Sequence, residues 1–186
     1  MKKLFLLVAL TAIIHMKSNA QSADANFMGT SILSAGIGVG SPFFGAGYSN
    51  SFPVNPTISY ERGVLDQLTV GGEFSYASSK FSYNDGFSSD NYTITYRAIY
   101  VGARGAYHLA SLLSLPQNID VYGGATVGYV IVSVSDNAGN AAALGSTVGY
   151  GGFAGGRLYL TPGTAVYAEL GYQSLSYLNI GLSFKL

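Results

Sequence analysis

The feature that most constrains this chain is an alternation of apolar and polar residues with a period of two. In the stretch YVGARGAYHL (100–109), Arg104 and His108 share one parity, and every position of the other parity is apolar or glycine. Successive side chains of a β-strand point to opposite faces, so the pattern predicts strands with one apolar face. The pattern recurs in eight segments, namely 32–40, 56–62, 67–77, 92–109, 119–132, 147–160, 165–173 and 177–186.

Seven charged residues lie on the less apolar parity of these segments, and the other parity is free of charge within the strand cores. The seven are Glu61, Glu73, Arg104, Asp120, Arg157, Glu169 and Lys185. A soluble sandwich would carry many more charges on its wet face, whereas only 10% of this chain is charged. A lipid-facing surface excludes charge, because Arg or Lys costs about 2–4 kcal/mol at the bilayer midplane, and lipid tolerates no open sheet edge. The sequence therefore predicts an all-β fold, an eight-stranded antiparallel up-and-down transmembrane barrel filled by its own side chains.

The connections between the segments alternate in length. Long polar connections are expected at 41–55, 77–91 and 133–146, tight turns at 63–66 and 161–163, and an intermediate one at 110–118. Short turns on one side and long loops on the other are typical of bacterial outer-membrane barrels. The connection around 174–176 is shorter than that pattern predicts. The aromatic residues of loops 41–55 and 77–91 make these loops candidates for contact with an extracellular or envelope partner.

The N-terminus has the pattern of a secretory signal peptide. Lys2 and Lys3 precede an apolar run from Leu4 to Ile14, and small residues end at Ala20. The run is too short to span a bilayer as a helix, which disfavours the alternative of an uncleaved anchor. We therefore expect a signal peptide at 1–20, cleaved after Ala20, and a barrel domain at 21–186. The mature chain would carry six basic and nine acidic residues, a balance that disfavours nucleic acid as a partner.

The charges on the polar parity need partners inside the barrel, because an uncompensated buried charge costs several kcal/mol. We expect a stacked interior network, joined by bidentate pairs, that consists of Glu73, Arg104, Arg157 and Glu169. His108 and Asp120 are expected to pair lower in the barrel. The expected role of these residues is structural, and gating or proton relay is the alternative.

Five stretches carry a resemblance to a known family: ISYERGVLDQLTVGGEFSY, YVGARGAYHL, DVYGGATVGY, GGFAGGRLYLTPGTAVYAELGY and YLNIGLSFKL. Through them the chain resembles the small outer-membrane β-barrels of the OmpA/OmpX type. The resemblance implies an outer-membrane location and an unspecified role in the cell envelope. The last strand resembles the signal read by the barrel-assembly machinery, with Phe184 and Leu186 in phase, although the commonest final residue is Phe.

The sequence favours a role in envelope integrity or surface adhesion, without catalysis. We expect a monomer in contact with outer-membrane lipid and with no cofactor. A metal site is not expected, since the mature chain holds one His and no Cys. One alternative is passage of small hydrophobic molecules through a narrow or lateral path. Others are a lipid-modifying enzyme, for which His108, Ser111 and Asp120 would be the candidate residues, and a soluble ligand-binding barrel in the periplasm.

Overall fold

The computed structural model describes residues 26–40, 49–50, 55–83, 92–137, 140–173 and 175–186. The expected signal peptide and most of loops 41–55 and 77–91 lie outside the described residues. The strands are β1 (Ser31–Val39), β2 (Ser49–Asn50), β3 (Asn55–Leu65), β4 (Leu68–Tyr83), β5 (Tyr92–His108), β6 (Ile119–Asp136), β7 (Ala141–Thr161), β8 (Thr164–Gln173) and β9 (Ser176–Lys185). No helix among the described residues is long and apolar enough to cross a membrane.

Eight of these strands form a closed antiparallel barrel. Each long strand pairs with its neighbours along the chain, β4 pairs with both β3 and β5, and β1 closes the ring against β9. The two-residue strand β2 adds to the edge of β4. The predicted eight-stranded up-and-down topology is confirmed.

The alternation in the sequence corresponds to the inner and outer faces of the barrel wall. In β3 the side chains alternate strictly from Asn55 to Val64, with Thr57 and Ser59 buried and Ile58 exposed by 52%. The pleat of a strand sends consecutive residues to opposite faces, so a buried polar parity and an exposed apolar parity mean a polar interior and an apolar outer wall.

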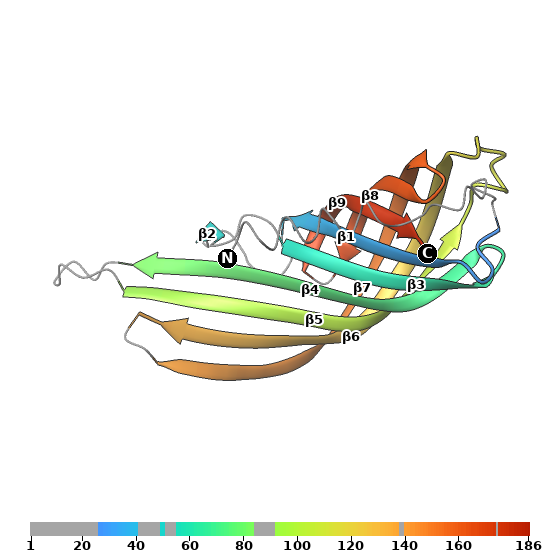
Figure 1. Cartoon of the computed structure of the whole chain (residues 1–186). Coiled ribbons are helices and arrows are strands. Elements are labelled where there is room, and N and C mark those ends of the chain that lie inside the picture. Colours follow the sequence, from blue (N-terminus) through green and yellow to red (C-terminus); the bar gives the residue numbers. More distant parts are fainter. Residues whose placement is uncertain (1–25, 41–48, 51–54, 84–91, 138–139, 174) are drawn as a thin grey trace.

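One side of the barrel is much taller than the other. Strands β4 to β7 have 16 to 21 residues, whereas the other strands of the ring have 9 to 11. Figure 1 shows the four long strands extending together far beyond the ends of β1 and β9. The expected loops at 77–91 and 133–146 are thus partly wrong, because strands continue to Tyr83 and Asp136. Backbone pairing persists there although the apolar alternation fades, since strands beyond the lipid need no apolar face.

A short segment before β1 folds under the barrel, where the sequence predicts no structure. The backbone N–H of Phe27 donates to the carbonyl of Asp66 at 2.8 Å, and the N–H of Thr30 donates to the carbonyl of Phe27 at 2.9 Å. These bonds hold the Phe27 ring inside the end of the barrel that carries the short turns, where Phe27 is 2% exposed. This end, with the turns at 66–67, 109–118 and 162–163, is called the turn end below.

Candidate functional site

Arg104 on β5 lies at the centre of the barrel interior and contacts three carboxylates. Its Nε lies 3.0 Å from Oε1 of Glu61 on β3. Its Nη1 donates to Oε2 of Glu73 on β4 at 3.0 Å, and its Nη2 donates to Oε1 of Glu169 on β8 at 2.7 Å. The Glu61 contact is an ion pair without an aligned hydrogen bond. Each nitrogen therefore contacts a different carboxylate, which differs from the bidentate pairs that the sequence led us to expect.

Arg157 on β7 forms the second cationic centre. Its Nη1 donates to Oδ2 of Asp120 at 3.3 Å, its Nη2 lies 3.5 Å from Oε1 of Glu61, and its Nε donates to Oγ of Ser183 at 3.3 Å. The guanidinium also lies 4.2 Å above the ring of Tyr122. The structure thus joins Arg157 to Arg104 through Glu61, a residue that the expected network of four left out.

His108 continues this network toward the turn end. Its Nδ1 lies 2.9 and 3.0 Å from the two oxygens of Asp120, and its Nε2 lies 3.1 Å from Oγ1 of Thr69. The hydroxyl of Thr69 donates to Oε2 of Glu61 at 2.6 Å. Thr69 therefore links His108 to Glu61, the carboxylate that contacts both arginines.

The barrel interior holds a high density of charge. Four carboxylates face the two guanidinium groups within a space where every one of these six residues is at most 4% exposed. A single charge buried to this extent is costly, so the six groups depend on the ion pairs between them.

Thr69, His108 and Asp120 stand in the order of a nucleophile, a base and an orienting acid. Thr69 is fully buried, its proton is directed to Glu61, and the Phe27 ring stacks on the imidazole with centroids 3.8 Å apart. Its oxygen is therefore not open to a substrate, whatever the spacing. Ser111, the hydroxyl considered from sequence, is exposed and accepts a bond from Nε2 of Gln67 at 3.0 Å.

Phe184 and Leu186 lie at the seam where the barrel closes. Phe184 faces Leu33 of β1 and Thr164 of β8 in the strand register, and the N–H of Leu186 donates to the carbonyl of Ser31 at 2.8 Å. Among the residues that the structure describes, no group of three His, Cys, Asp or Glu side chains is placed to hold a metal ion.

Solved structures share this architecture. The N-terminal β-barrel domain of OprF from Pseudomonas aeruginosa is similar to this chain with a TM-score of 0.50 at 14% identity, covering 86% of this chain and 98% of that one. The fold is that of the small eight-stranded outer-membrane β-barrels.

Two further solved barrels are similar at lower scores. Ail from Yersinia pestis, in complex with the heparin analogue sucrose octasulfate, has a TM-score of 0.47 at 16% identity, covering 85% of this chain and 96% of that one. A structure from the de novo design of transmembrane β-barrels has a TM-score of 0.47 at 15% identity, covering 86% and 97%. No family model matches the sequence, and no curated protein matches it.

Proposed function

We propose that this barrel is anchored in the bacterial outer membrane and presents a β-sheet on the cell surface for contact with a partner, without catalysis. The observation that carries the proposal is the one-sided extension of β4 to β7 beyond the rest of the ring. In this proposal the signal peptide is removed after Ala20, the assembly machinery reads Phe184 and Leu186, and the monomer is the functional unit.

The outer wall supports the membrane location. Large apolar side chains between the turn end and the extension are exposed, among them Ile58, Phe74, Val101, Val127, Ile180 and Leu182. Tyr150, Tyr172 and Tyr177 are about half exposed or more and lie side by side across β7, β8 and β9, with neighbouring ring centroids 6.3 and 6.4 Å apart. Tyrosines gather in this way where a barrel wall meets the lipid headgroups. In this proposal the three tyrosines lie at the membrane boundary farther from the turn end, and the long strands continue past that boundary.

The interior supports an anchor rather than a conduit. Arg104 and Arg157 reach across the lumen to carboxylates on other strands, and both side chains are 1% exposed. A lumen crossed by ion pairs at this burial is closed to solutes. Passage of small hydrophobic molecules would require these contacts to separate, at the cost of leaving charges unpaired.

The extension offers an edge for a partner strand. β8 meets β7 only as far as Gly151, so residues 141–150 of β7 pair with β6 alone. This edge reads AAALGSTVGY, without charge or proline, and residues 141–148 are all exposed. Proteins commonly protect free edges with lysine or proline, and an unprotected edge can add a strand from another chain. We infer that the partner of this sheet pairs with β7.

Orientation can be tested with single cysteines, because the chain has none of its own. A membrane-impermeant maleimide should label Leu144→Cys in intact cells and Ser111→Cys only after the cells are broken. Leu182→Cys, on the apolar wall of β9 between Tyr177 and the turn end, should remain unlabelled in both cases until detergent is added. Labelling of Ser111→Cys but not Leu144→Cys in intact cells would show that the turn end faces outward, which contradicts the proposal.

The surface role can be tested by charging the β7 edge. Cells that display the chain should be retained on an epithelial layer, and Ala142→Lys with Ser146→Lys should reduce retention at equal protein levels in the membrane. The matched control is Ser133→Lys with Ser135→Lys, which adds the same charge to β6 inside the same sheet. Equal retention for all three chains and for cells without the protein would contradict a surface-contact function.

A further inference from the structure

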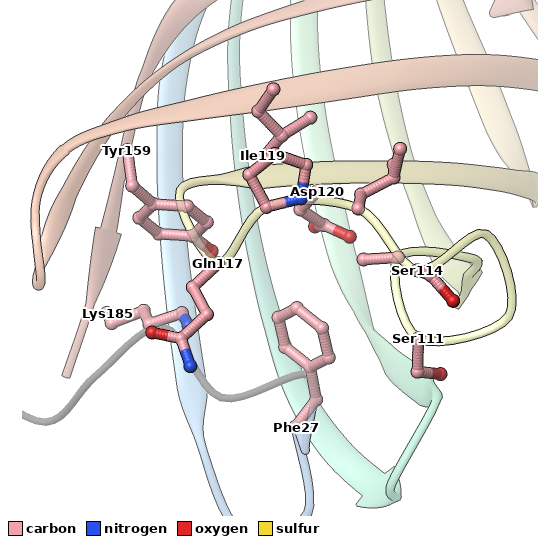
Figure 2. Close-up of a pocket in the computed structure, with 11 residues that line it drawn as sticks. Phe27, Ser111, Ser114, Gln117, Ile119, Asp120, Tyr159 and Lys185 are labelled. Atoms are coloured by element: carbon pink, nitrogen blue, oxygen red, sulfur yellow. The ribbon is translucent and has the colours of Figure 1, made fainter.

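A cavity of about 220 Å³ lies at the turn end, next to the ion-pair network of the barrel, with which it shares Asp120. Its walls come from the connection that follows β5, the start of β6, the ends of β7 and β9, and the segment before β1. Figure 2 shows Tyr159, Gln117 and Lys185 at one end of this space, Phe27 beneath it, and Ser111 and Ser114 at the other end. The cavity is thus assembled from parts of the chain that are far apart in sequence.

Tyr159 carries an unsatisfied donor in this cavity. The residue is 7% exposed, and its hydroxyl has no hydrogen-bond partner within the part of the chain that the structure describes. Figure 2 shows its ring reaching from β7 toward Gln117 and Lys185. A buried polar group without a partner is costly, and proteins keep few of them unless water or a ligand supplies the missing bond.

The charge next to this hydroxyl is positive. The ammonium group of Lys185 lies 4.4 Å from the centre of the Tyr159 ring and 5.0 Å from that of Phe27. Among the described residues that line the cavity, the carboxylate is that of Asp120, which already contacts His108 and Arg157. A ligand group placed beside Tyr159 and Lys185 therefore meets donors and a cation, which suits a carboxylate.

The rest of the cavity suits a small apolar body. The ring of Phe27 and the side chains of Leu115, Pro116 and Ile119 form its apolar walls. Pockets that bind small molecules combine mostly apolar walls with a few convergent polar groups, as this one does.

We propose that the turn end of the barrel binds a small monocarboxylate, whose carboxylate accepts a hydrogen bond from the Tyr159 hydroxyl beside the Lys185 ammonium and whose apolar part packs on Phe27. The site would face the periplasm under the orientation proposed above, but its existence is independent of that orientation and of any surface partner.

Benzoate is the probe, and its uncharged isostere benzamide is the control ligand. The refolded mature barrel in phospholipid nanodiscs is titrated with each compound, and binding is followed by the shifts of the backbone amide resonances of Ser111, Ser114, Gln117 and Tyr159. Benzoate should shift these resonances saturably with a Kd of roughly 1–10 mM, as expected for so small a ligand. Benzamide should bind about tenfold more weakly, because a hydrogen bond to a charged acceptor is the stronger one.

Tyr159→Phe removes only the hydroxyl and should weaken benzoate binding about tenfold. Lys185→Met, which keeps the length of the side chain, should weaken it to a similar degree. Tyr150→Phe, on the outer wall, should leave it unchanged. Because the hydroxyl lacks a partner among the described residues, Tyr159→Phe should not lower the urea midpoint of unfolding, whereas removal of a hydroxyl with a purely structural role would lower it.

The proposal is overturned if benzoate produces no saturable shift at the turn end, or if Tyr159→Phe binds benzoate as the unchanged chain does. It is also overturned if benzamide binds equally well, since the pocket would then select for shape and not for charge. If the chain binds benzoate but cells that display it are not retained on the epithelial layer, the carboxylate site stands and only the proposed surface role is contradicted.

Discussion

Phe27 and His108 lie face to face, with ring centroids 3.8 Å apart and an angle of 22° between the rings. The backbone N–H of Phe27 donates to the carbonyl of Asp66, and the His108 ring is held by hydrogen bonds with Asp120 and Thr69. The stack therefore closes the turn end over the charged interior and keeps water away from it. In that low-dielectric space the ion pairs between Arg104, Arg157 and their carboxylates are stronger than they would be in water.

Phe27→Ala should destabilise the barrel by about 3–5 kcal/mol, because it removes a buried ring and opens the network to water. The measurement is urea unfolding of the refolded protein in lipid. Met28→Ala is the matched control, since Met28 is 65% exposed one position along the same segment, and it should change stability by less than about 0.5 kcal/mol. Equal effects of the two substitutions would show that Phe27 does not seal the barrel.

Arg104→Met should cost about 3–5 kcal/mol, since it leaves Glu61, Glu73 and Glu169 facing one another with their central cation removed. Adding Glu73→Gln to Arg104→Met should recover part of the loss, so that the two changes together cost less than the sum of each alone. Arg97→Met is the control, because Arg97 is exposed and its guanidinium donates to the hydroxyl of Ser135 on β6 at 3.1 Å. Additive costs would mean that Arg104 and Glu73 do not interact energetically.

The strand pattern was predictable because the membrane imposes it. Each side chain of the wall faces either hydrocarbon or a sealed interior, so the alternation is strict where the wall is in lipid, as in β3 from Asn55 to Val64. The extension was underestimated for the same reason. Beyond the lipid, the end of β4 is held largely by its backbone pairing with β5, and the serines at 78 and 79 interrupt the apolar alternation from which a strand is predicted.

The interior was only partly predictable. The alternation predicts that Arg104, Glu73 and Glu169 point into the barrel, and the structure brings the three together. Glu61 has the same parity, so the sequence carried a sign of it, but its place between two arginines depends on the stagger of strands around a closed barrel. Phe27 lies outside any alternating segment, and only the fold of the segment before β1 reveals its position.

Gly155→Ala should destabilise the barrel by about 1–3 kcal/mol through overpacking. A methyl group at this position would lie 2.7 Å from the Tyr122 ring and 2.8 Å from Cγ of Glu169. These two side chains are joined by the Tyr122 hydroxyl, which donates to Glu169 at 2.9 Å, so neither can move without disturbing the bond. The adjacent Gly156→Ala is the control, because its nearest neighbour would be 3.6 Å away. Unfolding in urea measures both, and a larger loss for Gly156→Ala would contradict the interior packing described here.

Leu182→Arg should cost about 2–4 kcal/mol, because Leu182 is 39% exposed on the apolar wall of β9, five residues from Tyr177 toward the turn end, and the charge would enter hydrocarbon. Leu144→Arg is the matched control, since Leu144 is 59% exposed on β7 but lies beyond the tyrosine at position 150, on the extension. There the charge meets water, and the free energy of unfolding should change by less than about 0.5 kcal/mol. Reversible unfolding from lipid vesicles measures the difference between the two variants. A loss of the same size at both positions would place the extension in lipid, and no loss at either would place the wall of the barrel in water.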